Sequence, residues 1–133
     1  MKAVPLSAAL ALTALAVCAP VPAAAQPVRA ERVTLTNADN GRTVSAHTGD
    51  DIEVALTGSR ENGLAYFWSI PASDSAVLHR TAGGKTPTGG ATARFRVEKD
   101  GIATISATKH CHSGGGHLCP LVVVPWKVRV EVK

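Results

Sequence analysis

From residue 32 onward, the chain carries short runs in which apolar and polar residues alternate. A period of two is typical of a β-strand with one buried face, and these runs lack the 3.6-residue period of an amphipathic helix. Turn-forming residues such as the Asn62-Gly63 pair separate the runs. The pattern predicts about eight strands, at 32–36, 43–47, 52–56, 64–70, 77–80, 92–98, 102–107 and 126–133.

Many short strands separated by polar turns predict an all-β fold. We expect an immunoglobulin-like antiparallel β-sandwich of about 7–8 strands, built as two packed layers. Successive strands run in opposite directions, so alternate loops gather at one end. The segments 57–63, 81–90 and 109–119 should therefore share an end, and long loops are where function tends to lie.

The first 25 residues have a different character. A charged start at Lys2 is followed by an apolar run and by the small residues Ala23-Ala24-Ala25, which is typical of a secretory signal peptide. The apolar run is too short for a comfortable membrane span. We expect a signal peptide at 1–25 and one domain at 26–133, secreted or periplasmic and without stable membrane insertion.

Cys18 lies inside this predicted signal peptide. Its surroundings are somewhat similar to a bacterial lipoprotein cleavage box, but that box has a small residue where this chain has Val17. We therefore expect Cys18 to be discarded with the signal peptide instead of carrying a lipid anchor.

Composition narrows the classes of function. The chain has 14 Lys and Arg against 10 Asp and Glu, a formal net charge of +4, and its basic residues are scattered. Such a mild, dispersed charge does not indicate a nucleic-acid partner. The sequence has no nucleophile-elbow motif, paired-carboxylate signature or phosphate-binding loop with lysine. We expect a monomer that is not an enzyme, needs no cofactor and binds a protein partner.

The most unusual chemistry lies between residues 109 and 126. Cys111 and Cys119 are the two cysteines that remain after export, and an oxidising compartment favours a disulfide between them. His110, His112 and His117 lie beside them, and His/Cys clusters also bind zinc or copper. Across a hairpin, however, His110 and His112 would face away from His117 and the cysteines. A disulfide is the prediction, and a metal-binding envelope protein remains an alternative.

Four segments resemble the chagasin-like inhibitors of papain-type cysteine proteases. The strand at 49–56 leads into a loop whose Gly63 matches the last residue of the family's Asn-Pro-Thr-Thr-Gly motif. Gly89 and Gly90, ahead of Phe95-Arg96-Val97, resemble the family's Gly-x-Gly-Gly loop, with Pro87 at the first glycine. The segment 100–105 is similar to the family's next turn and strand, and Val124-Pro125-Trp126 is similar to its Arg-Pro-Trp motif.

The resemblance implies an immunoglobulin-like domain that occludes papain-family proteases with three clustered loops. The residues it assigns to these loops are Ser59, Arg60, Glu61, Asn62, Gly63, Leu64, Thr88, Gly89, Gly90, Pro125 and Trp126. The alternative is a secreted interaction or surface module of the same fold without inhibitory activity. The role of Trp126 also has two alternatives. It is either an exposed anchor at a loop tip or the first inward residue of the strand at 126–133.

Overall fold

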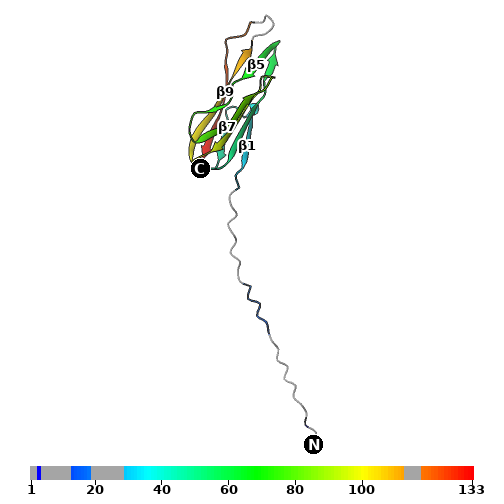
Figure 1. Cartoon of the computed structure of the whole chain (residues 1–133), viewed down its shortest axis with the longest axis vertical. Helices are drawn as coiled ribbons and strands as arrows, with labels where there is room; N and C mark the ends of the chain where they lie inside the picture. Colours follow the sequence, from blue (N-terminus) through cyan, green and yellow to red (C-terminus); the bar gives the residue numbers. More distant parts are fainter. Residues whose placement is uncertain (1–2, 4–12, 19–28, 113–117) are drawn as a thin grey trace.

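The computed structural model describes residues 3, 13–18, 29–112 and 118–133. Within these ranges, ten strands and one short 3-10 helix form the domain drawn in Figure 1. In chain order they are β1 (Arg32–Thr36), η1 (Asn37–Asp39), β2 (Thr43–Ala46), β3 (Asp51–Leu56), β4 (Ser59–Glu61), β5 (Leu64–Trp68), β6 (Ala72–Ser73), β7 (Leu78–Lys85), β8 (Ala91–Val97), β9 (Gly101–His112) and β10 (Val124–Val132).

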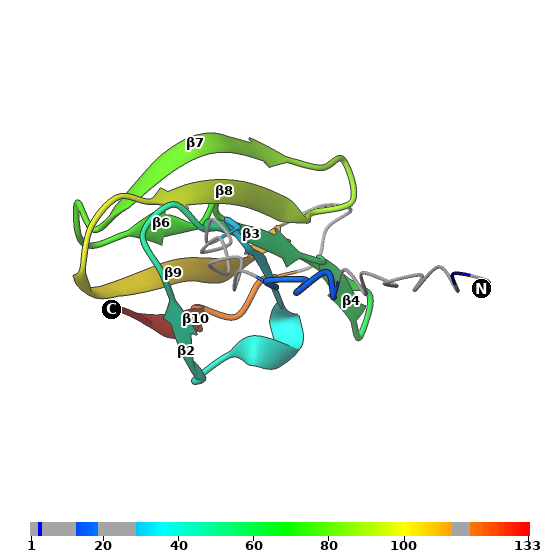
Figure 2. The ribbon, with the colours of Figure 1, turned by 90° about the horizontal axis from the view of Figure 1, so that it is seen from below.

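The strands form two sheets that pack face to face. One sheet has the order β1-β3-β8-β7 and the other β2-β10-β9-β5-β4, with β6 also paired to β9. Figure 2 shows β7 and β8 in one layer and β9 and β10 in the other. The predicted all-β, immunoglobulin-like sandwich is confirmed. Two pairings differ from the antiparallel expectation, because β1 runs parallel to β3 and β2 runs parallel to β10.

These parallel pairings arise because the chain changes sheets between β1 and β2, at η1. Asp39 closes this crossing. Its carboxylate accepts a 2.7 Å hydrogen bond from the backbone N–H of Thr36 and a 2.6 Å bond from the Arg42 guanidinium. The Thr36 N–H, helped by the charge of Arg42, holds the pKa of Asp39 below its ordinary value of 3.8.

Replacing Asp39 by asparagine should destabilise the domain by about 1 kcal/mol at pH 7, because the charge-assisted bonds are weakened. The folded-state pKa is depressed, so this contribution is complete above the unfolded-state pKa and is lost as the pH falls through the folded value. Urea unfolding of both proteins should show the difference at pH 7 and a smaller one near pH 3. An equal difference at both pH values would contradict the assignment.

The core lies between the two sheets and follows the predicted alternation. Inward residues of β3, β8, β9 and β10 are almost fully buried, and the outward residues between them are more exposed. The largest fully buried side chains include Trp126, Phe95, Leu35, Ile52, Ile105, Val54, Val97, Val128 and Val130. The core therefore supplies a firm base for the loops at either end.

Three strands extend into segments that the sequence pattern assigns to loops. β4 lies inside the expected loop 57–63, β7 continues to Lys85 inside the expected loop 81–90, and β9 continues to His112. β4 has no apolar alternation because it is a short edge strand, and Gly83-Gly84 weaken the strand signal of β7.

Most of the predicted signal peptide, 1–25, falls outside the described residues, so it stays a prediction. Within the part of the chain that the structure describes, no helix has the length and hydropathy that a membrane crossing requires.

Candidate functional site: the loop end of the sandwich

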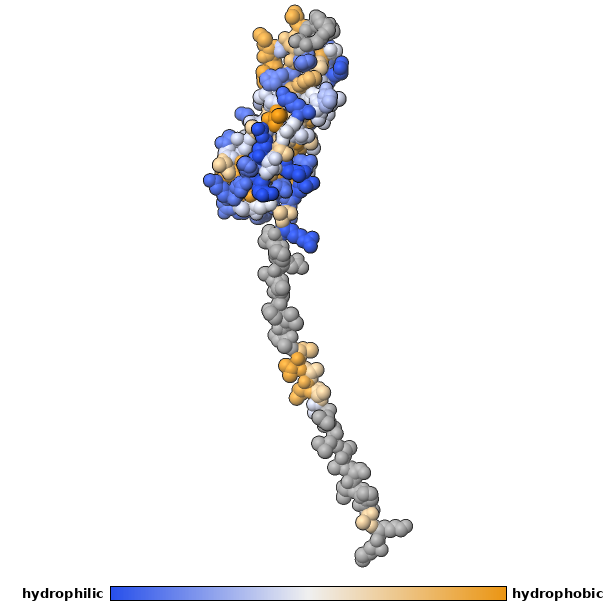
Figure 3. Space-filling view, in the orientation of Figure 1, coloured by the Kyte–Doolittle hydropathy of each residue, from blue (hydrophilic) through white to orange (hydrophobic). Residues whose placement is uncertain are grey.

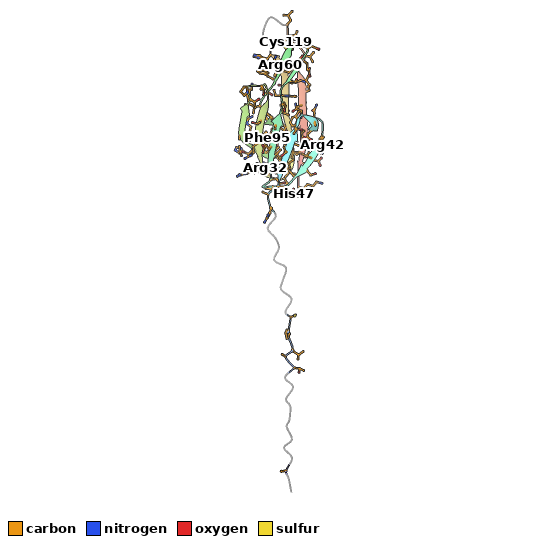
Figure 4. The ribbon with its side chains drawn as sticks, turned by 90° about the vertical axis from the view of Figure 1, so that its right-hand side faces the viewer. Arg32, Arg42, His47, Arg60, Phe95 and Cys119 are labelled. Atoms are coloured by element: carbon orange, nitrogen blue, oxygen red, sulfur yellow. A yellow bond between two sulfur atoms is a disulfide. The ribbon has the colours of Figure 1, made fainter. Side chains whose placement is uncertain are left out.

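Three connections meet at one end of the domain. They are the segment 57–63, the β7–β8 turn at 86–90, and the end of β9 at 109–112 together with residues 118–124, which lead into β10. We call this region the loop end. Figure 1 places it opposite the C-terminus and the start of β1, and Figure 4 shows Cys119 and Arg60 near it, with His47 and Arg32 at the other end.

Glycines allow the segment 57–63 and the β7–β8 turn to lie in close contact. The backbone N–H of Trp68 donates to the Gly89 carbonyl at 2.9 Å, so the β7–β8 turn lies against the edge of β5. A Cβ on Gly58 would lie 2.5 Å from the Thr88 carbonyl oxygen, and one on Gly89 would lie 2.5 Å from Phe67 Cδ1. Gly89 also has a φ of +86°, which favours glycine. The close approach of these two segments therefore requires glycine.

The β7–β8 turn is closed by Thr86. Its hydroxyl accepts a hydrogen bond from the Gly90 N–H at 2.9 Å, and its own N–H donates to the Gly90 carbonyl at 2.9 Å. Gly89 and Gly90 are buried, whereas Pro87 and Thr88 are exposed. Of the residues predicted for this loop, only Thr88 presents a side chain outward.

The β4–β5 hairpin turns at Asn62 and Gly63, as the sequence predicts. Both residues have a positive φ, of 52° and 78°, which is the requirement of a type I′ hairpin turn. Glu61, Asn62 and Gly63 are exposed and form the projecting tip, while Ser59 and Leu64 are partly buried. At Gly63 the tip offers backbone alone, beside the exposed side chains of Glu61 and Asn62.

Lys109 ties this hairpin to β9 on the inner face of the sheet. Its ammonium lies 3.7 Å from the Glu61 carboxylate and above the rings of Tyr66 and Trp68, 5.3 and 5.9 Å from their centroids. The Trp68 indole N–H donates to the Thr57 carbonyl at 2.9 Å. These contacts hold the hairpin against β9, while Asn62 and Gly63 stay exposed.

Trp126 does not belong to the loop end. It lies within β10, pairs with Ala107, is 1% exposed, and donates its indole N–H to the Thr36 carbonyl at 3.1 Å. The interpretation of Trp126 as an exposed anchor is therefore wrong, and the strand interpretation is confirmed. The reason is that β10 starts at Val124, so Pro125 and Trp126 are already paired with β9.

A different set of apolar residues, at 118 and 121–124, is exposed at the loop end. Leu118 is 94% and Leu121 101% exposed, and residues 122–124 are exposed as well. Figure 3 shows hydrophobic side chains at the loop end beside the β9–β10 connection. Reasoning from the sequence missed this surface, although the run 121–124 has no polar residue and so does not fit a half-buried strand.

The predicted disulfide between Cys111 and Cys119 is confirmed, with Cα atoms 5.6 Å apart. It connects β9 to the start of the exposed apolar run.

His110 and His112 lie on the opposite face of β9 from Cys111, as the alternation predicts. His117 lies outside the described residues, and among those described no three His, Cys, Asp or Glu side chains are placed to hold a metal ion.

Replacing both cysteines by serine should destabilise the domain by about 2–3 kcal/mol, the loop-closure entropy of a short disulfide ring. Reduction of the native chain should lower the urea midpoint, whereas the double variant should not respond to reductant. An unchanged urea midpoint of the native chain after complete reduction would show that the disulfide contributes nothing to stability.

The fold is that of the chagasin-like cysteine protease inhibitors. The chain superposes on the cysteine protease inhibitor EhICP2 from Entamoeba histolytica with a TM-score of 0.57 and 17% identity, over 79% of this chain and 98% of that one. It also superposes on the inclusion body protein PixA from Burkholderia cenocepacia with a TM-score of 0.52 and 8% identity, over 81% and 98% of the two chains. No protein-family model and no curated protein matches the sequence.

At sequence identities this low, structural similarity establishes a shared fold and nothing further. The resemblance drawn from the loops is thereby confirmed at the level of architecture. Because PixA has the same architecture, function has to be argued from the loop end.

Proposed function

We propose that the loop end occludes the active-site cleft of a papain-type cysteine protease, without any covalent chemistry. The observation that carries the proposal is the close contact between Gly58 and Gly89, which we call the glycine joint. It holds the segment 57–63 and the β7–β8 turn side by side on a firm sandwich. A surface ordered before binding loses little conformational entropy when it meets its target.

The β4–β5 tip is the central element of the proposed contact. Gly63 has no side chain, and among the described residues other than its two chain neighbours no atom lies within 4 Å of the place that a Cβ would take there, so a partner can approach its backbone closely. Ser59, Arg60 and Leu64 form the base of this element. Thr88 flanks it on one side, and the exposed apolar run 121–124 takes the place of Pro125-Trp126 on the other.

The proposal includes export and action as a monomer. The internal disulfide supports an oxidising compartment, because such bonds are rare in the cytosol. Cleavage of the predicted signal peptide would release residues 26–133 as a secreted or periplasmic domain.

An inhibition assay of residues 26–133 against papain tests this function. We expect reversible inhibition at micromolar concentration or below, with the chain recovered uncleaved. Gly63→Ala should weaken inhibition by roughly tenfold, since a new Cβ at the tip prevents close approach of the backbone. No inhibition by the native chain at micromolar concentration would remove the proposal.

The matched control is Gly49→Ala. Gly49 also has a positive φ, of 95°, and an unobstructed Cβ position, but it lies two residues from His47 at the opposite end of the domain. Both variants carry the same kind of backbone strain, so only an effect on the contact surface can separate them. Equal loss of inhibition in both would point to stability instead of contact.

A second candidate is an interaction module of the same fold without inhibitory activity. The burial of Trp126 favours it, because the third loop motif then supplies no exposed anchor. The exposed run 121–124 suits a protein partner of any class. A chain that fails to inhibit papain but binds a partner through Leu121 would support this candidate.

A further inference from the structure

A pocket of about 520 Å³ opens on the outer face of the second sheet, between the β4–β5 hairpin and the β7–β8 turn. Its size is in the range that holds a small molecule or a large side chain. Arg60, Ala65, Phe67, Thr88 and His112 are among the residues that line it. The family resemblance assigns Arg60 and Thr88 to the protease contact but no ligand to the pocket itself.

Strand register explains how these residues meet. Arg60 of β4 pairs with Ala65 of β5, and Ala65 pairs with His112 of β9. Directly paired residues share a face, with Cβ atoms about 5 Å apart. The small side chain of Ala65 therefore forms a floor between two larger polar side chains, and Phe67, two residues further on, lies on the same face.

Two of the polar side chains that line the pocket are free to bind a ligand. Within the described residues, Arg60 makes no ion pair or hydrogen bond, and the imidazole nitrogens of His112 have no hydrogen-bond partner. Ser59, also in the lining, pairs with Tyr66, so its enclosed hydroxyl belongs to the opposite face of the sheet from Arg60 and His112. Arg60 and His112 are therefore the side chains that a ligand can reach.

Charge and shape define the ligand. No Asp or Glu is among the residues that line the pocket, and the neighbouring Glu61 pairs with Lys109. A guanidinium binds carboxylates with two parallel hydrogen bonds. The ring of His112 stacks on Phe67 with centroids 4.5 Å apart, which provides a flat surface for an apolar stem.

We infer that this pocket binds the carboxylate of an acidic side chain on the protein partner. The carboxylate lies over Ala65 and accepts hydrogen bonds from Arg60, while the stem of the side chain contacts Phe67 and His112. The identity of the partner rests on the proposed function, because the pocket lies between two of the connections proposed to contact the protease. The preference for a carboxylate rests on the pocket alone.

Amide NMR titration of the isotope-labelled chain with two blocked dipeptides, acetyl-Phe-Glu-amide and acetyl-Phe-Gln-amide, tests the inference. The two probes have the same shape and differ in charge. We expect the glutamate peptide to shift Ala65, Phe67 and His112, and to bind roughly tenfold more tightly than its glutamine twin. Equal binding of the two peptides, or no binding, would overturn the inference.

Arg60→Gln should remove this preference, and Arg60→Lys should restore only part of it because an ammonium lacks the two-pronged geometry. Arg96→Gln is the matched control, since Arg96 is an exposed arginine on the other sheet. A preference that survives in Arg60→Gln would also overturn the inference. Papain inhibition separates the two proposals: a chain that prefers the glutamate peptide but does not inhibit papain loses only the proposed function.

Discussion

Replacing Gly89 by alanine is expected to destabilise the domain by about 2–4 kcal/mol. Two costs add. Alanine is strained at a φ of +86°, and its Cβ would lie 2.5 Å from Phe67 Cδ1 and 2.9 Å from the Tyr66 carbonyl oxygen. Relief of this overlap requires the β7–β8 turn to move away from β5, which breaks the bond between Trp68 and Gly89. Inhibition should therefore fall further than stability alone accounts for.

Urea unfolding followed by tryptophan fluorescence measures the first effect, because Trp68 and Trp126 are both buried. Gly84→Ala is the control. Gly84 lies in the same hairpin, has no positive φ, and has open space around its Cβ position. If the Gly89 and Gly84 variants were equally stable, the joint between the two connections would not have the role assigned to it.

Trp126→Ala is expected to cost about 3–5 kcal/mol, the loss typical of a large aromatic residue in a packed core. The side chain is 1% exposed, and its indole N–H bonds to the Thr36 carbonyl across the change of sheets. A loss of this size is comparable with the whole stability of a small domain. The variant should be partly or wholly unfolded at room temperature.

Trp126→Phe keeps the prediction testable if the alanine variant does not fold. It retains most of the packing and loses the hydrogen bond, so we expect a folded domain with a lower urea midpoint and nearly native papain inhibition. Leu121→Ala, at an exposed position, should show the reverse pattern. A Trp126→Phe variant of native stability with impaired inhibition would restore Trp126 as a binding anchor.

The fold could be predicted from the sequence because strands with one buried face show apolar residues at every second position. The runs at 52–56, 92–98 and 126–133 became β3, β8 and most of β10, with the predicted residues inward. The disulfide could be predicted for a different reason, since two cysteines remain once the predicted signal peptide is set aside, and two cysteines allow a single pairing. These features depend on local pattern or on simple counting.

The details of the candidate site depend on contacts between distant residues. Nothing local marks β4 as a strand, because Ser59-Arg60-Glu61 is polar and, among the described strands, it pairs with β5 alone. The row of Arg60, Ala65 and His112 follows from the register of three strands, which a single sequence does not specify. The sequence does not decide between the two interpretations of Trp126 for the same reason, because its burial depends on how far β10 pairs with β9.

If the loop end is the surface that meets the protease, its backbone amides should respond when the two proteins bind. Amide NMR of the isotope-labelled chain, with and without papain, measures this response residue by residue. We predict that the largest perturbations fall at 57–63, 86–90 and 118–124, with little change at the opposite end around His47 and Asp100. Perturbations concentrated at that opposite end, or none at saturating papain, would contradict the assignment of the loop end as the binding surface.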